Sequence, residues 1–72
     1  MFMGKTFGLT RRELQVIATV VAGYTAKDIA RKLGISEQAV KRHLTNISVK
    51  LDVSNRLELV LFAVSHHLAS AS

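Results

Sequence analysis

Residues 25–51 read TAKDIARKLGISEQAVKRHLTNISVKL, and this stretch decides the fold. Thr25 and Ser36 are residue types that cap helix N-termini, and each precedes a run of apolar residues at helical spacing. Gly34 stands between the two runs, where glycine readily adopts the left-handed conformation that ends a helix. The stretch therefore predicts a helix over residues 26–33, a tight turn, and a longer helix over residues 37–51.

The longer helix has one apolar face and one basic, polar face. At about 100° per residue, the residues that form a narrow stripe toward the core are Val40, Leu44, Ile47 and Leu51. The opposite side carries Gln38, Arg42, Thr45, Asn46 and Val49, with Lys41 at one edge and His43 and Lys50 on the other flank. This is the pattern of a helix-turn-helix whose second helix enters a DNA groove.

A further helix is expected on each side of this unit. Thr10 and Glu13 have the spacing of a capping box, which begins a helix over residues 10–22. The residues expected to form its buried face are Leu14, Ile17, Ala18 and Val21. Ser54 is expected to cap a last helix over residues 55–68.

The last helix is apolar on two sides. One stripe consists of Leu57, Val60, Leu61, Val64 and Leu68, and the roughly opposite stripe of Leu59, Phe62, Ala63 and His66. A short helix with two apolar faces needs two partners. We assign the first stripe to the core and the second stripe to an interface with another copy of the chain.

The length, composition and charge of the chain limit its possible fold, partners and location. The chain has 72 residues, 49% of them hydrophobic, which indicates one packed domain. The sequence predicts an all-α, four-helix domain over residues 9–69, with a leader or linker remnant over residues 1–8 and a frayed tail over residues 70–72. Lys and Arg outnumber Asp and Glu by 10 to 5, which favours an anionic partner such as nucleic acid. No apolar run approaches the roughly 20 residues of a membrane span, so no membrane contact and a cytoplasmic location are expected.

The polar face of the longer helix carries groups suited to DNA. Residues expected near bases are Gln38, Lys41, Arg42, Thr45, Asn46 and Val49. Arg42 or Lys41 can donate to guanine, and Thr45 can form a hydrogen bond or place its methyl group against that of thymine. Val49 could touch an apolar base edge or face solvent. Residues expected near phosphates are Thr25, Lys27, Ser36, His43 and Lys50. For His43, a half-buried place beside the core stripe is an equal alternative.

Enzyme chemistry has no support in the sequence. His66 and His67 are adjacent, so they point to different helix faces and do not form a metal-binding pair. Cysteine is absent, which excludes disulfides and cysteine-ligated zinc. The scattered acids form no evident pair of carboxylates. We therefore expect no catalytic residues, no metal and no cofactor.

Two runs, LTRRELQVI over residues 9–17 and AGYTAKDIARKLGISEQAVKRHLTNISVKLDVSNRLELV over residues 22–60, resemble the LuxR/FixJ-type (GerE-like) helix-turn-helix domain of bacterial transcriptional regulators. The resemblance implies residues 37–51 as recognition helix and dimerisation through the last helix. It implies base-proximal roles for Lys41, Arg42 and Thr45, phosphate roles for Lys27, His43 and Lys50, and a structural role for Arg56 at helix termini. The chain departs from the family pattern at Thr25-Ala26 and at Ala39, where a phosphate-binding hydroxyl is lost.

Three functions follow from these observations. The first is sequence-specific binding of double-stranded DNA by a homodimer that regulates transcription, as the C-terminal effector domain of a response regulator or quorum-sensing-type regulator. The second is a promoter-binding domain like region 4 of sigma factors, which also contacts RNA polymerase. The third is a protein-interaction module without a DNA function.

Overall fold

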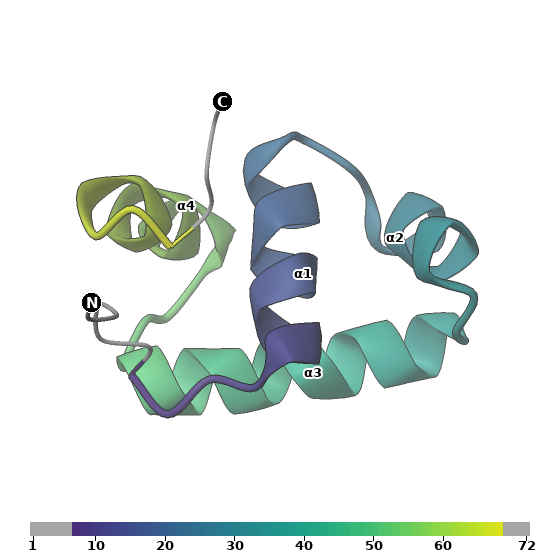
Figure 1. Cartoon of the computed structure of the whole chain (residues 1–72), viewed down its shortest axis with the longest axis horizontal. Coiled ribbons are helices and arrows are strands. Elements are labelled where there is room, and N and C mark those ends of the chain that lie inside the picture. Colours follow the sequence, from purple (N-terminus) through teal and green to yellow (C-terminus); the bar gives the residue numbers. More distant parts are fainter. Residues whose placement is uncertain (1–6, 69–72) are drawn as a thin grey trace.

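The computed structural model describes residues 7–68, which fold into four helices. These are α1 (Arg11–Val21), α2 (Ala26–Leu33), α3 (Glu37–Leu51) and α4 (Arg56–Ser65). In Figure 1, α3 runs along one edge of the molecule and α1 stands across it, with α2 and α4 on opposite sides of α1. No strand occurs within this described part, and the predicted all-α, four-helix fold is confirmed.

Reciprocal hydrogen bonds define the start of α1. The Glu13 amide donates to Thr10 Oγ1 at 3.1 Å, and the Thr10 amide donates to Glu13 Oε1 at 2.9 Å. The helix ends at Val21, and the φ of 95° at Gly23 permits the amides of Gly23 and Tyr24 to bond back to Val20 and Thr19. This pattern is a Schellman motif, and it satisfies carbonyl groups that the helix end would leave without partners.

The helix-turn-helix forms as predicted, with α2 and α3 at the expected bounds. Thr25 Oγ1 accepts from the Asp28 amide at 3.2 Å, and Ser36 Oγ accepts from the Ala39 amide at 3.0 Å. Between them Gly34 has a φ of 70°, which lets the chain reverse directly from α2 into α3. The side chains of Thr25 and Ser36 therefore set where α2 and α3 begin.

The four helices enclose one hydrophobic core. Its fully buried members include Val16 and Ile17 of α1, Ile29 of α2, Val40 and Ile47 of α3 and Ala63 of α4. The predicted α3 stripe is confirmed, with Leu51 buried and Leu44 half-buried. The predicted α1 face is partly wrong. Ala18 is exposed, and Val16 and Val20 are buried in its place.

The bounds predicted for α4 need correction at both ends. The N-cap is Asn55, whose Oδ1 accepts from the Glu58 amide at 2.9 Å, rather than Ser54. The Ser54 amide instead donates to Glu58 Oε1 at 2.6 Å. The helix ends at Ser65, three residues before the predicted end at residue 68, because His67 adopts a left-handed φ of 56°.

The two apolar faces of α4 are partly exchanged relative to the prediction, although Val60 and Leu68 of the first stripe are half-buried against the core as expected. Leu59 and Ala63, expected at a dimer interface, are core residues with 3% and 0% of their surface exposed. Leu57, Leu61 and Val64, expected in the core, are 67%, 58% and 55% exposed. Both faces are apolar, so their hydrophobicity could not decide which one turns inward. The packing of α4 against α1 and α3 decides it.

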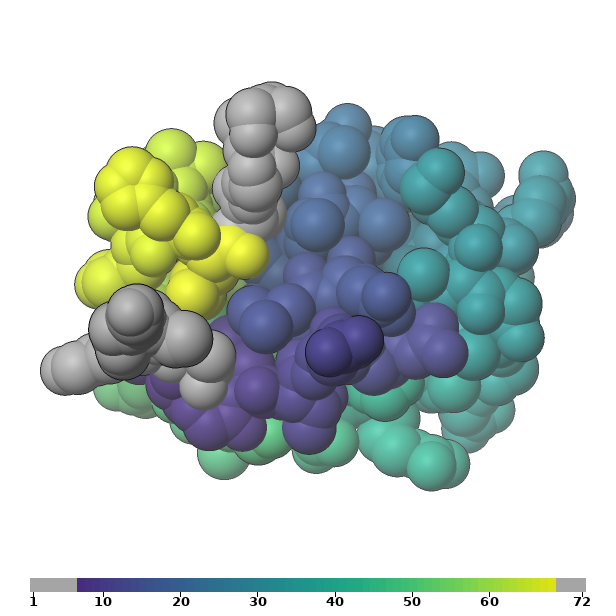
Figure 2. All heavy atoms as spheres, in the orientation of Figure 1, coloured from purple at the N-terminus to yellow at the C-terminus, as the bar shows by residue number. Residues whose placement is uncertain are grey.

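Phe7 and Gly8, which the sequence assigned to a leader, pack onto the domain. The Phe7 ring meets the rings of Phe62 and His66 edge-on, each at 5.2 Å between centroids, and Phe62 stacks on His66 at 4.1 Å. Figure 2 shows the segment that leads into α1 (purple) lying between α3 (green) and the end of α4 (yellow). Phe62 and His66, expected at a dimer interface, thus contact the start of the domain. Residues 1–6 and the predicted tail over 70–72 lie outside the described residues.

None of the four helices has both the length and the apolar character that a membrane crossing requires, within residues 7–68.

Candidate nucleic-acid interface

The exposed side of α3 carries all the residues expected near bases. Core packing covers the opposite side of this helix, where Val40 and Ile47 are fully buried. The side chains expected near bases are all exposed, and they are Gln38, Lys41, Arg42, Thr45, Asn46 and Val49. We call these six residues the reading face. Because the reading face runs from Gln38 to Val49, it extends along about 17 Å of the helix.

Two members of the reading face have a distinctive surface chemistry. Val49 is 76% exposed and is the most exposed large hydrophobic residue in the described part of the chain. Thr45 is exposed, but its hydroxyl donates to the backbone carbonyl of Lys41 at 3.0 Å. The remaining polar members (Gln38, Lys41, Arg42 and Asn46) can present their side-chain donors outward.

The residues expected near phosphates lie in different environments. Lys27, Thr25 and Ser36 are exposed, and both hydroxyls already accept hydrogen bonds from backbone amides of their own helices. Each hydroxyl keeps its own hydrogen to donate, so both the hydroxyls and the unpaired amides of the first turns are groups that α2 and α3 can offer to an anion. His43 is half-buried on α3. This position agrees with the half-buried alternative and leaves part of the ring accessible.

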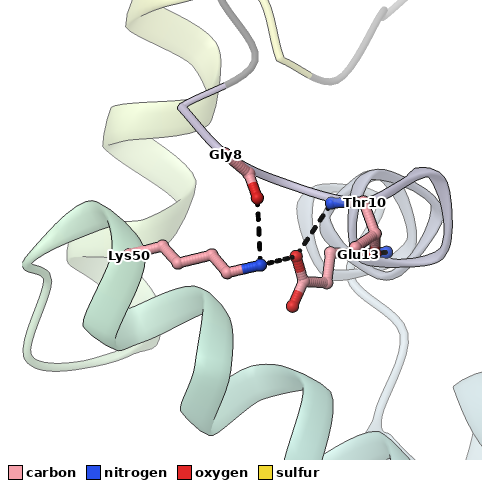
Figure 3. Close-up of polar contacts among 4 residues, drawn as sticks. All are labelled: Gly8, Thr10, Glu13 and Lys50. Carbon is pink, nitrogen blue, oxygen red and sulfur yellow. Dashed lines mark hydrogen bonds and ion pairs between the residues drawn. The ribbon is translucent and has the colours of Figure 1, made fainter.

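Lys50, which is expected near a phosphate, has its ammonium in contact with two groups of the protein itself (Figure 3). Lys50 Nζ donates to Glu13 Oε1 at 2.7 Å and to the Gly8 carbonyl at 3.0 Å. The Glu13 side chain is 4% exposed and that of Lys50 is 33% exposed. Two of the three N–H donors of Lys50 thus connect the end of α3 to the start of α1.

The Glu13 carboxylate stays ionised although it is buried. Burial alone raises the pKa of this carboxyl, since a low-dielectric surrounding disfavours the charge. The hydrogen bond from Lys50, the hydrogen bond from the Thr10 amide and the Lys50 charge together outweigh burial, and the pKa of Glu13 lies below its usual value. One acidic side chain therefore serves the capping box and the ion pair.

Arg56 holds the opposite end of α1. Its guanidinium donates to the carbonyl of Tyr24, in the turn between α1 and α2. The ammonium of Lys32 lies over the Tyr24 ring, 5.3 Å from the centroid. Arg56 thus has the structural role at helix termini that the resemblance implied.

Sequence reasoning missed the partner of Lys50 and the exposed face of α4. The sequence predicts Glu13 only as a capping residue, and it predicts the exposed residues Leu57, Leu61 and Val64 in the core. The spacing of these three residues places them on one side of a helix. Because the other side of this helix is also apolar, the spacing alone does not show which side is exposed. No group of three or more His, Asp or Glu side chains within residues 7–68 is arranged to hold a metal ion.

Comparison with known proteins identifies the family. The sequence pattern of the family "Bacterial regulatory proteins, luxR family" matches residues 8–63. The chain belongs to this family. The luxR-family match covers α1, α2 and α3 completely and most of α4, and it favours the first of the three functions over the other two. The domain is accordingly one that binds DNA in the regulation of transcription.

Several luxR-type relatives share most of this chain. The uncharacterized transcriptional regulatory protein YhcZ of Bacillus subtilis is 44% identical over 64 residues, which are 89% of this chain and 30% of that protein. The transcriptional regulatory protein LiaR of the same organism is 42% identical over 62 residues, 86% of this chain and 29% of LiaR. The response regulator protein VraR of Staphylococcus aureus is 37% identical over 60 residues, 83% of this chain and 29% of VraR. The chain thus spans about three tenths of the length of these relatives.

Proposed function

We propose that this domain binds double-stranded DNA in a sequence-specific manner, with α3 in the major groove. The observation that carries the proposal is the reading face, a row of exposed polar and basic side chains on a helix whose other side is anchored in the core. A major groove about 12 Å wide admits one α-helix and presents a distinct pattern of donors and acceptors for each base pair. A rigidly held helix is what such a readout requires.

Within this interface some side chains are suited to contact bases and others to contact phosphates. Lys41 and Arg42 supply the donors that suit guanine O6 and N7. Lys27 and the first-turn amides of α2 and α3 contact phosphates, which set the position of the protein along the duplex without reading sequence. His43 contributes a phosphate contact with the accessible part of its ring. The net charge of +5 supports this arrangement through attraction to the duplex.

We further propose that a second copy of the chain covers the exposed face of α4. Leu57, Leu61 and Val64 follow one another at intervals of four and three residues, so they lie on one side of the helix. All three are more than half exposed, although their size and hydrophobicity favour burial. This set replaces Leu59 and Ala63, which are in the core. A two-fold dimer would bind two half-sites, matching the symmetry of the protein.

The larger protein context is also a proposal. The relatives are about three times longer than the aligned segment, and their names describe transcriptional regulators and a response regulator. We propose that this domain is the C-terminal effector of a cytoplasmic regulator of that kind. RNA polymerase is a further candidate partner, because a domain of this type acts at promoters.

Selection of bound duplexes from a random DNA library tests the proposal. We expect enrichment of one motif, repeated as two inverted half-sites about 10–10.5 base pairs apart or a multiple of that distance. The Leu61→Lys variant should keep the half-site preference and lose the fixed spacing. Recovery of no motif would reject sequence-specific binding.

The salt dependence of binding separates this function from a protein-interaction module. Neutralising several phosphates releases counterions, so the logarithm of the binding constant should fall steeply and linearly with the logarithm of salt concentration. A domain that retains its basic residues only for solubility would give weak binding to every duplex and no preferred sequence.

A further inference from the structure

Two methyl-bearing side chains stand one helical turn apart in the reading face. Thr45 and Val49 are separated by four residues, which places them on the same side of α3, about 6 Å apart along the helix axis. Both are exposed, and Val49 exposes 76% of its surface. Their neighbours on this side, Arg42 and Asn46, are polar.

The hydroxyl of Thr45 is not free to donate to a base. It donates to the Lys41 carbonyl of the same helix at 3.0 Å, so its single hydrogen is used within the protein. The group that this exposed side chain still offers outward, apart from the acceptor capacity of the oxygen, is its methyl group. Of the two uses that the sequence left open for Thr45, this geometry favours the methyl contact.

Helix stability does not explain these two residues. Threonine and valine are β-branched, and at exposed helix positions each is less favourable than alanine by roughly half a kcal/mol. Neither contributes to the core, which lies on the opposite side of α3. Two β-branched side chains on the exposed side of a helix that is otherwise polar there suggest a contact surface for an apolar group.

We propose that Thr45 and Val49 form a methyl-reading strip that contacts the C5-methyl groups of two thymines in the major groove. This inference rests on the proposed function and adds the chemical identity of bases within the target site. Thymine is the standard base whose major-groove edge carries a methyl group, and apolar contacts with it are a known means of recognition. The basic residues Lys41 and Arg42 on the same helix provide the attraction that brings the strip to the duplex.

The spacing of the strip predicts the spacing of the thymines. Successive nucleotides rise by about 3.4 Å along the duplex, and the two side chains are about 6 Å apart along the helix. With α3 lying along the groove, the two methyl groups should belong to base pairs roughly two steps apart. The guanine expected near Arg42 should lie beside the thymine that Thr45 contacts, because Arg42 is one turn before Thr45.

Replacement of thymine by uracil in the selected DNA tests the strip directly. Deoxyuridine keeps the base-pairing edge and the O4 acceptor of thymidine and lacks only the methyl group. Each thymine of the selected half-site is replaced singly, and the affinity of the wild-type domain is measured for each duplex. We expect a loss of about fourfold at two positions, the effect of removing one methyl-sized apolar contact, and little change elsewhere.

Matched variants connect each position to one side chain. Thr45→Ser removes the methyl group and keeps a hydroxyl for the Lys41 carbonyl, so this variant should lose the thymine-to-uracil discrimination at one position only. Thr45→Val keeps a methyl group and removes the hydroxyl, and it should retain that discrimination. Val49→Ala should lose discrimination at the second position only. The circular dichroism and melting temperature of each variant verify that the exposed substitutions leave the fold intact.

The outcomes distinguish the strip from the DNA-binding proposal itself. Enrichment of a motif whose affinity is insensitive to uracil at every position would overturn the strip and leave sequence-specific binding in place. Uracil sensitivity that is the same in the wild type, Thr45→Ser and Val49→Ala would also overturn it, since the effect would then come from the shape of the DNA. Absence of any enriched motif would overturn both proposals.

Discussion

Lys50 of α3 and Glu13 of α1 form an ion pair at 2.7 Å although 37 residues separate them in the chain. The same Glu13 oxygen accepts the Thr10 amide, and the same ammonium donates to the Gly8 carbonyl. The pair therefore joins the start of α1, the segment before it and the last turn of α3. It is a polar contact between α1, which packs against α3, and α3, which carries the reading face.

Removal of the Lys50 charge should destabilise the domain. In Lys50→Met the buried Glu13 carboxylate loses its cation and one hydrogen bond, and leaving a buried acceptor without a partner costs about 1–3 kcal/mol. The measurement is urea unfolding at neutral pH, with the exposed Lys41→Met as a matched control that should change stability by no more than about 0.5 kcal/mol. In a Glu13→Gln background, Lys50→Met should cost clearly less. If Lys50→Met lowered the unfolding free energy equally in both backgrounds, Lys50 and Glu13 would not be energetically coupled.

Acidification should remove the contribution of Glu13. Its pKa is lowered in the folded state, so its ionised form contributes stability that is complete above the usual value of 4.5 and is lost as pH falls through the lower folded-state pKa. The difference in unfolding free energy between the wild type and Glu13→Gln should be constant from pH 7 to about pH 5 and narrow below the usual value. Two stability curves that remain parallel down to pH 2 would contradict this assignment.

The two faces of α4 should respond oppositely to truncation. Leu59→Ala removes a core side chain and should destabilise the domain by about 2–5 kcal/mol. Leu61→Ala removes a side chain that is 58% exposed, and the stability of the monomer should change by about 0.5 kcal/mol or less. Sedimentation should instead show weaker self-association for Leu61→Ala. The prediction fails if Leu61→Ala unfolds the dilute protein as severely as Leu59→Ala does.

Arg42 and Lys27 should differ in what they contribute to DNA binding. Arg42→Ala should weaken binding to the selected site by about 1–3 kcal/mol and relax the preference at one base pair. Lys27→Ala should weaken binding to all duplexes alike and reduce the slope of the salt dependence by about one unit. Titrations of specific and random duplexes at several salt concentrations measure both effects. A specificity change in Lys27→Ala would contradict its assignment to phosphate.

Asp52 should be a site where glycine stabilises the domain. Asp52 ends α3 with a left-handed φ of 57°, a conformation that costs a residue with a side chain roughly 1 kcal/mol. Its carboxylate also lies at a helix C-terminus, where negative charge is unfavourable. Asp52→Gly should therefore raise the unfolding free energy by about 0.5–1 kcal/mol, and Asp52→Asn by less. Thermal unfolding provides the comparison, and a lower melting temperature for Asp52→Gly would refute the argument.

The helix-turn-helix was predictable because independent local signals agree there. The caps at Thr25 and Ser36, the turn at Gly34 and the one-sided apolar pattern of residues 37–51 all indicate the same boundaries. For α4 the signals conflict. Ser54 and Asn55 are both good N-caps, and the helix is apolar on two sides, so neither its first residue nor its buried face followed from the sequence.

The candidate site also has features that the sequence predicts and features that it does not predict. Exposure of the reading face follows from the position of the core stripe, which the helical period determines. The pairing of Lys50 with Glu13 does not follow from the sequence, because no local pattern connects residues 37 positions apart. The direction of the Thr45 hydroxyl was also open, since threonine in a helix has two accessible rotamers and only one returns a hydrogen bond to the preceding turn.

The ring contact between Phe7 and the end of α4 has a consequence for anything joined to the start of this domain. Gly8 lies beside the last turn of α3 through Lys50, and Phe7 lies on Phe62 and His66. The connection to any preceding body would therefore lie at the C-terminal end of α3, far from α2 and from the N-terminal end of α3 (Figure 1). The N-terminal half of α3 thus lies away from the point where such a body would be joined.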